Sequence, residues 1–473
     1  MISYKNYSEK IVQIQNGSLS LTDNVKFFLD EIEKAKDLNA FNFVFEDSLD
    51  TAKKVEQKIK NGTGGRLAGM VVAIKDVLSI KDKPLTCSSK ILGNFTSLYT
   101  ATSVQKLIDE DAIIIGKTNC DEFAMGSSNE NSHFGVVKNP INQEYVPGGS
   151  SGGSAAAVSG KLCDVALGTD TGGSIRQPAA FCGVYGLKPS YGRVSRYGLT
   201  AFASSFDSIG AFANNIYDIA LVHQIISGYD EKDSTSEKVD VPNYIDFSEN
   251  SKNFKVGIPK EYFGEGLNEE IKSAIKNKIA KLKENGIEVV DISLPNMEYA
   301  IATYYILTTA EASSNLARYD GARYGHRTHD KTNLKGMYTK SRSEGFGKEV
   351  KRRIMLGTYV LSAGYYDAYY KKAQQVRRII KNDFDNVFKN VDIILSPTTP
   401  TTAFKIKEKI EDPLQMYLGD VYTTSANLAG IPGINIPIGK NSMGLPIGMQ
   451  LMANQFKENE LLSFTKKTLN IIS

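Results

Sequence analysis

The chain of 473 residues contains no tryptophan, only four histidines and four cysteines, and no long hydrophobic run. No Cys-x-x-Cys pair occurs, so neither a zinc ribbon nor a dithiol redox motif is expected. No segment approaches the roughly 18 apolar residues that a membrane-spanning helix requires, and the first residues lack the apolar stretch of a secretory signal. We therefore expect a soluble, cytoplasmic protein with buried free thiols at Cys87, Cys120, Cys163 and Cys182.

An excess of charge of either sign is also lacking. Lysine and arginine number 56 against 53 aspartates and glutamates, which gives a formal net charge of +3. That balance provides no strong field for binding nucleic acid or an anionic membrane. Hydrophobic residues make up 41% of the chain, which excludes a disordered protein. The length alone suggests about three domains, with one large α/β domain as the alternative.

Short apolar runs alternate with helical patterns along the chain. Runs typical of strands cover residues 70–74, 112–115 and 165–167, while residues 22–36 and 103–109 have the apolar spacing of helices. Strands that alternate with helices favour parallel pairing, with helices on both faces of the sheet. The sequence therefore predicts an α/β fold with a central mixed, mainly parallel twisted sheet covered by helices on both faces.

Residues 228–253 interrupt this alternation with a polar stretch, which we interpret as a surface connection outside the core. Strands and helices resume beyond it, so the stretch is not a clean domain boundary. The later expected elements are strands at 255–258, 287–290 and 391–395, a helix capped by Asn268, and helices at about 297–316 and 348–388. We expect one large domain over residues 1–473, with a helical N-terminal part at about residues 1–65.

Two segments rich in glycine and serine stand out, at residues 147–154 and 168–178. Such segments are most often flexible linkers, but structured sequence flanks both of these. Phosphate binding is a second alternative, although neither segment has a P-loop or a Gly-x-Gly-x-x-Gly pattern. Acyl transfer is the third: Gly172 and Gly173 would let consecutive N–H groups point at one oxyanion, next to Ser174 as nucleophile.

A nucleophilic serine also needs a base. Three of the four histidines lie in an apolar helical run or a polar loop, where packing or solvation is their more common role: His223, His326 and His329. His133 leaves a Ser-His-Asp arrangement open, but no Gly-x-Ser-x-Gly motif surrounds any serine.

Lys75, at the end of the apolar run 70–74, is the alternative base. A lysine at a strand end usually extends its ammonium group into water. If Lys75 were buried instead, desolvation would lower its pKa. A shift from about 10.4 to about 7 costs about 4–5 kcal/mol, which a large core can offset. The neutral amine could then accept a proton.

Together these segments resemble the amidase signature family. The resemblance rests on Lys75 in Val-Val-Ala-Ile-Lys-Asp, on the run Gly148–Ser154, and on Asp170-Thr171-Gly172-Gly173-Ser174-Ile175-Arg176-Gln177-Pro178. Members of the family use a triad of a lysine, a serine at a cis peptide and a nucleophilic serine. The resemblance implies that Lys75 is the base, Ser150 the bridging serine and Ser174 the nucleophile. It also implies oxyanion N–H groups on Thr171, Gly172, Gly173 and Ser174.

Within that family the sequence is most similar to the subunits that hydrolyse glutamine for tRNA-dependent amidotransferases. The similarity extends over nearly the whole chain and includes residues 121–128, 343–354, 364–370 and 427–433. It implies that Arg353 holds the α-carboxylate of glutamine, with Arg352 as the alternative, and that Asp420 holds the α-amino group. These residue types suit the task, because a free amino acid presents both charges and a guanidinium fork matches a carboxylate.

The resemblance implies partners as well. Ammonia would pass to a GatB-like B subunit, which would use ATP and Mg²⁺ to amidate Glu-tRNA(Gln), Asp-tRNA(Asn) or both, and a GatC-like C subunit would complete a heterotrimer. No cofactor or metal is expected in this chain. Two alternatives stay open: a free-standing amidase that acts on another amide, and a scaffold subunit that has the fold without catalysis.

Overall fold

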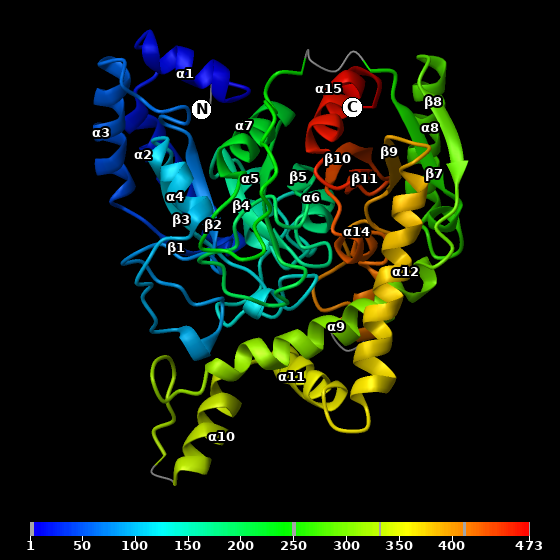
Figure 1. Cartoon of the computed structure of the whole chain (residues 1–473). Helices are drawn as coiled ribbons and strands as arrows, with labels where there is room; N and C mark the ends of the chain where they lie inside the picture. Colours follow the sequence, from blue (N-terminus) through cyan, green and yellow to red (C-terminus); the bar gives the residue numbers. More distant parts are fainter. Residues whose placement is uncertain (1–3, 248–251, 331–332, 410–412, 473) are drawn as a thin grey trace.

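The computed structural model describes residues 4–247, 252–330, 333–409 and 413–472. One sheet of 11 strands runs through this part of the chain in the order β1-β3-β2-β4-β6-β5-β10-β11-β9-β7-β8, and helices lie on both sides of it (Figure 1). The strands are β1 (Phe41–Val44), β2 (Val71–Lys75), β3 (Ile113–Thr118), β4 (Val165–Asp170), β5 (Tyr185–Lys188), β6 (Ser208–Ala213), β7 (Lys255–Pro259), β8 (Glu288–Ile292), β9 (Ile393–Pro397), β10 (Gly433–Lys440) and β11 (Pro446–Ala453).

Both faces of the sheet are buried. On β2, Val72 and Ile74 belong to one apolar cluster and Val71 and Ala73 to the other, because successive side chains of a strand point to opposite faces. The covering helices are α1 (Tyr7–Gln15), α2 (Leu21–Lys34), α3 (Ser48–Lys60), α4 (Thr102–Asp109), α5 (Gly152–Ser159), α6 (Arg176–Cys182), α7 (Ile216–Ile226), α8 (Glu269–Glu284), α12 (Lys372–Val387), α13 (Pro413–Leu418), α14 (Thr424–Ala429) and α15 (Glu458–Ile472).

The strand directions differ from the expectation in the middle of the sheet. Six of the ten neighbouring strand pairs are antiparallel and four are parallel. The parallel pairs join β2 to β3 and β4, and β7 to β8 and β9, where the sequence shows helical patterns between strands. A mixed sheet is therefore confirmed, but its centre, from β4 through β6, β5, β10 and β11 to β9, is antiparallel. The strands β5, β6, β10 and β11 were not predicted from the sequence pattern.

Most of the predicted elements occur close to the predicted positions. Asn268 caps α8, since its side chain accepts hydrogen bonds from the N–H groups of Glu270 and Ile271. The expected helix at 348–388 is interrupted: α11 (Lys348–Val360) ends early and Gly364 adopts a φ of +87°. A π-helical turn (Tyr366–Lys371) then leads into α12. Glycine at this left-handed position allows the reversal that a continuous helical pattern does not reveal.

The polar connection at 228–253 is more firmly anchored than predicted. Tyr244 is fully buried and stacks on His223, with ring centroids 4.6 Å apart. Asp233 accepts a hydrogen bond from the backbone N–H of Arg196 at 2.8 Å. The interpretation of a stretch wholly outside the core is therefore wrong at these two residues. The overall polar composition of the stretch did not reveal that single residues in it are buried. Residues 248–251 of the stretch lie outside the described residues.

Three helices gather at one end of the sheet, below it in Figure 1: α9 (Ala300–Asn315), α10 (Leu334–Gly345) and α11. α9 packs against α11. Through this packing α11 brings Arg353 beside Tyr305 of α9, with 5.2 Å between the ring centroid and the guanidinium carbon. No helix in the described ranges is both long and apolar enough to cross a membrane.

Candidate active site

Lys75 is the last residue of β2, and its side chain is fully buried. Its Nζ lies 2.8 Å from each of three hydroxyl oxygens, those of Ser150, Ser151 and Thr169. Burial lowers the pKa of Lys75 from 10.5 to about 8, because desolvation disfavours the ammonium form. A buried amine in contact with hydroxyl groups can therefore gain or lose a proton near neutral pH.

The three hydroxyl groups come from the two segments rich in glycine and serine. Ser150 follows a cis peptide bond from Gly149, and its carbonyl oxygen accepts a hydrogen bond from the N–H of Asp121 at 3.1 Å. Ser151 directly precedes α5, and Thr169 lies on β4. Nothing in the sequence pattern had identified Ser151 and Thr169 as neighbours of Lys75. Their place in the two segments was visible, but the direction of their side chains depends on how β2 and β4 pair.

Ser174 lies in the turn between β4 and α6 and is 8% exposed, whereas Lys75 and Ser150 have no exposure. Its carbonyl oxygen accepts a hydrogen bond from the N–H of Ser151 at 3.3 Å. Among the described residues, no hydrogen bond joins the hydroxyl groups of Ser174 and Ser150. The structure thus brings Lys75 and Ser150 into contact and places Ser174 beside the next residue. Catalytic hydrogen bonds are often long in the free enzyme and tighten when substrate binds.

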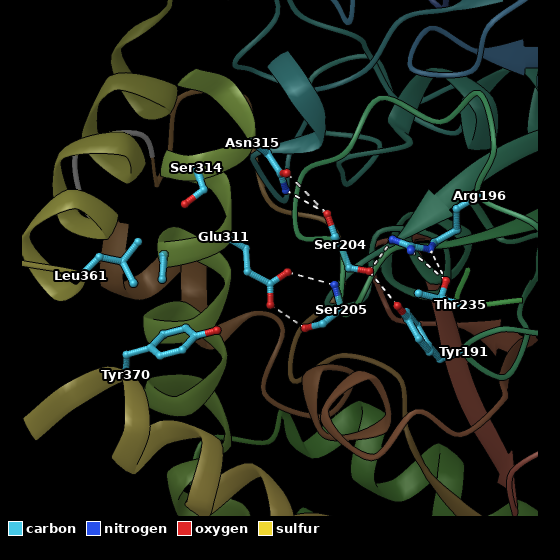
Figure 2. Close-up of a pocket in the computed structure, with 11 residues that line it drawn as sticks. Tyr191, Arg196, Ser204, Ser205, Thr235, Glu311, Ser314, Asn315, Leu361 and Tyr370 are labelled. Carbon is cyan, nitrogen blue, oxygen red and sulfur yellow. Dashed lines mark hydrogen bonds between the residues drawn. The ribbon is translucent and has the colours of Figure 1, made fainter. Parts of the chain in front are cut away.

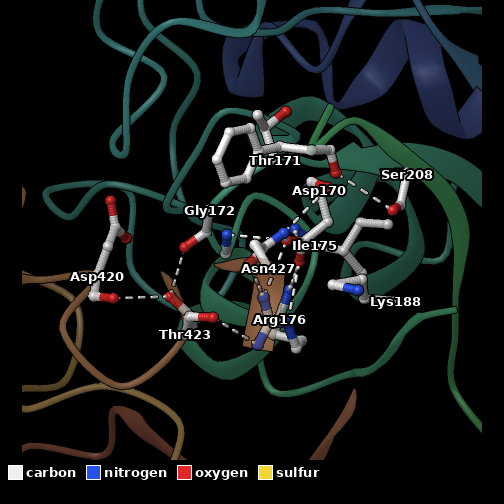
Figure 3. A network of polar contacts seen from close by, with 12 residues as sticks. Asp170, Thr171, Gly172, Ile175, Arg176, Lys188, Ser208, Asp420, Thr423 and Asn427 are labelled. Carbon is white, nitrogen blue, oxygen red and sulfur yellow. Dashed lines mark hydrogen bonds and ion pairs between the residues drawn. The ribbon is translucent and has the colours of Figure 1, made fainter. Parts of the chain in front are cut away.

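A buried ion pair holds the turn that carries Ser174 (Figure 3). Asp170 and Arg176 are both fully buried, and Arg176 Nη2 lies 3.0 Å from Asp170 Oδ1. The guanidinium group also donates to the carbonyl of Thr423 and to the side chains of Asn427 and Gln450. Burial by itself would raise the pKa of Asp170, but the charge of Arg176 and its hydrogen bonds lower it to about 2. The turn is thereby fastened to α14 and β11.

The carboxylate of Asp170 also binds one of the four predicted oxyanion N–H groups. The N–H of Gly173 donates to Asp170 Oδ1 at 2.9 Å, so this group is already committed to an acceptor. Within the described part of the chain, the N–H groups of Thr171, Gly172 and Ser174 have no hydrogen-bond acceptor. The expectation that Gly173 contributes an oxyanion N–H group therefore does not fit this structure. Three of the four predicted donors remain available.

Glycine is required at two positions of this turn by the close approach of neighbouring side chains. A Cβ atom on Gly172 would overlap the ring of Tyr304, and one on Gly173 would overlap Thr423. Gly173 also has a φ of +139°, a backbone angle that residues other than glycine rarely adopt. Thr423 in turn donates its hydroxyl hydrogen to the carbonyl of Gly172 at 2.7 Å. These contacts set the direction of the free N–H groups.

Arg353 extends from α11 into a cavity of about 210 Å³. Its side chain is buried, and Nε donates to Glu349 at 2.8 Å. The neighbouring Arg352, which also pairs with Glu349, has a side chain that is one-third exposed. Both arginines line the cavity, together with Tyr417 and Ser128. The cavity therefore offers guanidinium groups to an anion.

Asp420 lies just outside the lining of that cavity. Its carboxylate accepts a hydrogen bond from the hydroxyl group of Ser127, whose neighbours Gly126 and Ser128 do line the cavity. Burial raises the pKa of Asp420 to about 7, although the Ser127 hydroxyl and the charge of Arg353 oppose the shift. The structure thus places Asp420 near enough to Arg353 for their charges to interact, and Ser127 links the aspartate to the segment that lines the cavity.

In the described part of the chain, no histidine is hydrogen-bonded to Lys75, Ser150 or Ser174. His223 is packed in α7, where burial lowers its pKa to about 4, and this confirms the predicted core position. His326 pairs with Glu344 at 2.8 Å. The backbone N–H of His133 donates to Ser88, and its side chain lines a cavity of about 260 Å³ together with Glu122 and Gly347. No hydrogen bond in the described ranges joins a histidine to Ser174, so lysine is the base that this geometry favours.

A protein-family model described as Amidase matches residues 23–462 of the chain. The chain belongs to the amidase family. The match includes Lys75, both segments rich in glycine and serine, Arg353 and Asp420. The family resemblance expected from the sequence is therefore confirmed.

This amidase is similar over nearly all of its length to proteins named as one part of a larger enzyme. The A subunit of glutamyl-tRNA(Gln) amidotransferase from Chlorobium phaeobacteroides (strain DSM 266) is 54% identical over 463 residues, which cover 97% of each chain. The protein of the same name from Prosthecochloris aestuarii is 54% identical over 99% of this chain and 98% of its own length. The crystal structure of the A subunit of the same enzyme from Thermotoga maritima has a TM-score of 0.77 and 39% identity, and the match covers 93% of this chain and 89% of that chain.

A larger cavity of the amidase, of about 390 Å³, lies between α9 and the loop before β6 (Figure 2). Glu311 of α9 accepts hydrogen bonds there from the N–H and the hydroxyl group of Ser205. Phe202 of the same loop lies against the guanidinium group of Arg353, 5.5 Å from ring centroid to carbon. The loop therefore lines this cavity and also packs on the side chain that extends into the smaller one.

Proposed function

We propose that this chain is the glutamine-hydrolysing A subunit of a tRNA-dependent amidotransferase. The observation that carries the proposal is the buried Lys75 amine, bonded to Ser150 in the segment next to Ser174. The names of relatives that are 54% identical over nearly full length support the choice of glutamine as substrate. An arginine-lined cavity beside these groups suits the carboxylate of a free amino acid.

Glutamine binds with its α-carboxylate on Arg353 and its α-amino group near Asp420, so that its side-chain amide faces Ser174. A carboxylate and an ammonium group are each matched by an opposite charge, which fixes the position of the amide carbon. Binding of the two charged ends of glutamine, away from the reacting bond, orients the amide carbon toward Ser174.

Ser174 then attacks the amide carbon while its proton passes through Ser150 to neutral Lys75. The negative charge that develops on the amide oxygen is stabilised by the N–H groups of Thr171, Gly172 and Ser174. Return of the proton by the same route expels ammonia and leaves a γ-glutamyl ester on Ser174. A water molecule, deprotonated by the same relay, hydrolyses the ester to glutamate and restores the hydroxyl group.

The ammonia is used by partner subunits in the cytoplasm. A GatB-like subunit binds ATP and Mg²⁺ and amidates mischarged tRNA, and a GatC-like subunit completes the heterotrimer. The near-neutral charge of this chain, +3 over 473 residues, suits a subunit that does not itself grip tRNA. The final product is Gln-tRNA(Gln), Asn-tRNA(Asn) or both, as set by the partners and by the mischarged tRNA that the cell supplies.

The decisive experiment is Ser174→Ala in the complex of this chain with its B and C subunits. We expect glutamine hydrolysis to fall by more than about a thousandfold, because loss of a nucleophile leaves only binding and oxyanion stabilisation. Amidation of tRNA should continue when ammonium chloride replaces glutamine, since the partner site is untouched. The measurements are glutamate release and the formation of amidated tRNA.

The matched control is Ser151→Ala, which also removes a hydroxyl group bonded to Lys75 but leaves the proposed relay complete. We expect this variant to retain far more glutaminase activity than Ser174→Ala. Activity of Ser174→Ala within tenfold of the wild-type rate would contradict the assignment of the nucleophile. Wild-type hydrolysis of other amides without any hydrolysis of glutamine would contradict the proposed substrate.

A further inference from the structure

Glu349 of α11 is the centre of a compact cluster of charged and aromatic side chains. Its Oε1 accepts hydrogen bonds from Arg353 Nε at 2.8 Å and from the hydroxyl group of Tyr417 at 3.0 Å. Its Oε2 accepts one from Arg352 Nη1. Glu349 and Arg353 are both buried and lie one helical turn apart. The carboxylate therefore has three donors around it and is only 8% exposed, so it cannot rearrange freely.

The bond to Glu349 leaves the end of the Arg353 side chain unoccupied. Only Nε is bonded to the protein; Nη1 and Nη2 have no acceptor within the described part of the chain. These two nitrogens can bind a carboxylate end-on, in a parallel, bidentate arrangement. Arg353 also lines the cavity of about 210 Å³, so the free end of its guanidinium group is the part available to a ligand.

Aromatic rings hold the plane of the same guanidinium group. The rings of Phe202, Tyr305 and Tyr417 lie 5.2–5.6 Å from its central carbon. Tyr305 and Tyr417 stack on each other with centroids 3.9 Å apart. Because Tyr417 also donates to Glu349, one side chain contacts both members of the ion pair. Rotation of the guanidinium group would break several of these contacts together.

The charges around the cavity leave an excess of positive charge for a ligand. Four of its lining residues are cationic, namely Lys348, Arg352, Arg353 and Lys409, and two are acidic, namely Glu130 and Glu349. Glu349 alone is shared by two arginines, so the pair of arginines keeps one net positive charge. The anion that binds here neutralises this excess without displacing Glu349.

We propose that Glu349 is a positioning residue that aims the free end of Arg353 at the α-carboxylate of the substrate, and so selects amides of α-amino acids over simple amides. The inference rests on the proposed glutaminase function and deepens it. Glu349 touches neither the substrate nor the reacting amide; it acts through Arg353. Tyr417 supports the same orientation, since it donates to the carboxylate oxygen that also accepts from Arg353 Nε.

The test measures binding by isothermal titration calorimetry in the assembled complex that carries Ser174→Ala, so that no hydrolysis occurs. The two ligands are glutamine and 4-aminobutanamide, which lacks only the α-carboxylate. We expect Glu349→Gln to weaken glutamine binding about fivefold to tenfold, since the ion pair that holds Arg353 is replaced by a weaker hydrogen bond to an uncharged amide oxygen. The affinity for 4-aminobutanamide should not change. If Glu349→Gln instead lowered the affinity for both ligands equally, its effect would be a general loss of structure, and the proposal would be overturned.

A double-mutant cycle tests whether Glu349 acts through Arg353. In a background of Arg353→Ala, Glu349→Gln should have no further effect on glutamine binding, because the group that it positions is gone. Additive losses would overturn the proposal. Tyr417→Phe keeps the ring but removes its hydrogen bond to Glu349, and we expect a smaller loss for glutamine alone. If Glu349→Gln fails to fold, Tyr417→Phe decides the question. The proposal is overturned if Tyr417→Phe binds glutamine as tightly as the parent complex.

The matched control is Asp385→Asn on α12, which neutralises another acid paired with a cation four residues away, Lys381. This variant should bind both ligands as the parent complex does. Failure of the proposed function gives a different result from failure of the inference. In the first case the parent complex does not bind glutamine; in the second it binds glutamine, and Glu349→Gln binds it equally well.

Discussion

Four lysines are fully buried in the described part of the chain, and their partners differ in kind. Lys10 and Lys117 each pair with a carboxylate, of Asp164 and Asp76 respectively. Lys188 donates to two backbone carbonyl groups. Lys75 alone among them contacts hydroxyl groups only. A carbonyl oxygen can only accept a hydrogen bond, whereas a hydroxyl group both accepts and donates. Of the four, Lys75 is therefore the one whose partners can relay a proton.

The pH dependence of acylation should report the state of this amine. In the proposed mechanism neutral Lys75 is the base, and burial lowers its pKa to about 8. Below pH 8 most of the population carries the ammonium group, so the rate should rise about tenfold for each pH unit and level off above pH 8. Lys75→Met, which keeps most of the volume, should lower the rate at least about a hundredfold and remove this dependence. Single-turnover kinetics of glutamine hydrolysis measure both effects.

Lys188→Met is a suitable control for that experiment. Lys188 is also fully buried, and burial lowers its pKa to about 7. It contacts the carbonyl groups of Pro189 and Ile431 rather than any hydroxyl group of the site. The variant should keep the wild-type pH profile. A profile that depends on Lys188 and not on Lys75 would refute the assignment of the base.

At the scale of elements, the turn between β4 and α6 depends on one buried carboxylate. Asp170 accepts hydrogen bonds from the N–H groups of Gly173 and Ile175 and from the side chain of Arg176. Arg176 extends these contacts to α14 and β11. A short segment therefore takes its shape from parts of the chain that lie about 250 residues further on.

Replacement of Asp170 by asparagine should destabilise the protein. The change leaves the buried charge of Arg176 without its partner, and such losses amount to about 3–5 kcal/mol. We expect a matching decrease in the free energy of unfolding in urea at pH 7, where the pKa of about 2 keeps Asp170 ionised in the native state. Circular dichroism follows the unfolding, and glutamine hydrolysis should fall because the proposed oxyanion N–H groups lose their alignment.

The exposed residue Asp367, which pairs with Lys371, provides the comparison. Asp367→Asn should change the unfolding free energy by less than about 1 kcal/mol, since surface ion pairs contribute little. If Asp170→Asn were no less stable than this control, the ion pair would not be what holds the turn.

At the scale of the whole molecule, the proposed function requires partner chains. We expect the chain to copurify with B and C subunits as a heterotrimer, measured by size-exclusion chromatography with light scattering. Glutamine hydrolysis should increase when mischarged tRNA is added to this complex, because ammonia release is useful only when an acceptor is present. A chain that remains alone and hydrolyses amides at a rate independent of partners and tRNA would instead be a free-standing amidase.

The sequence by itself predicted the class of fold and the types and order of the candidate site residues. Alternating strand and helix patterns identified β2, β3 and β4, because a short apolar run between two helical patterns can be recognised from the local sequence. Lys75, Ser150 and Ser174 all lie in or beside segments whose composition is unusual by itself. What the residues could do chemically followed from their types, and the family resemblance suggested how they act together.

Only the tertiary structure decided which groups meet. Ser151 and Thr169 share the amine of Lys75 because β2 pairs with β4. The N–H of Gly173 is committed to Asp170, and the central strands run antiparallel. Tyr244 of the polar connection is buried against His223. Each of these facts depends on contacts between residues distant in sequence or on the direction of a side chain. Local periodicity and composition determine neither the long-range contacts nor the side-chain directions.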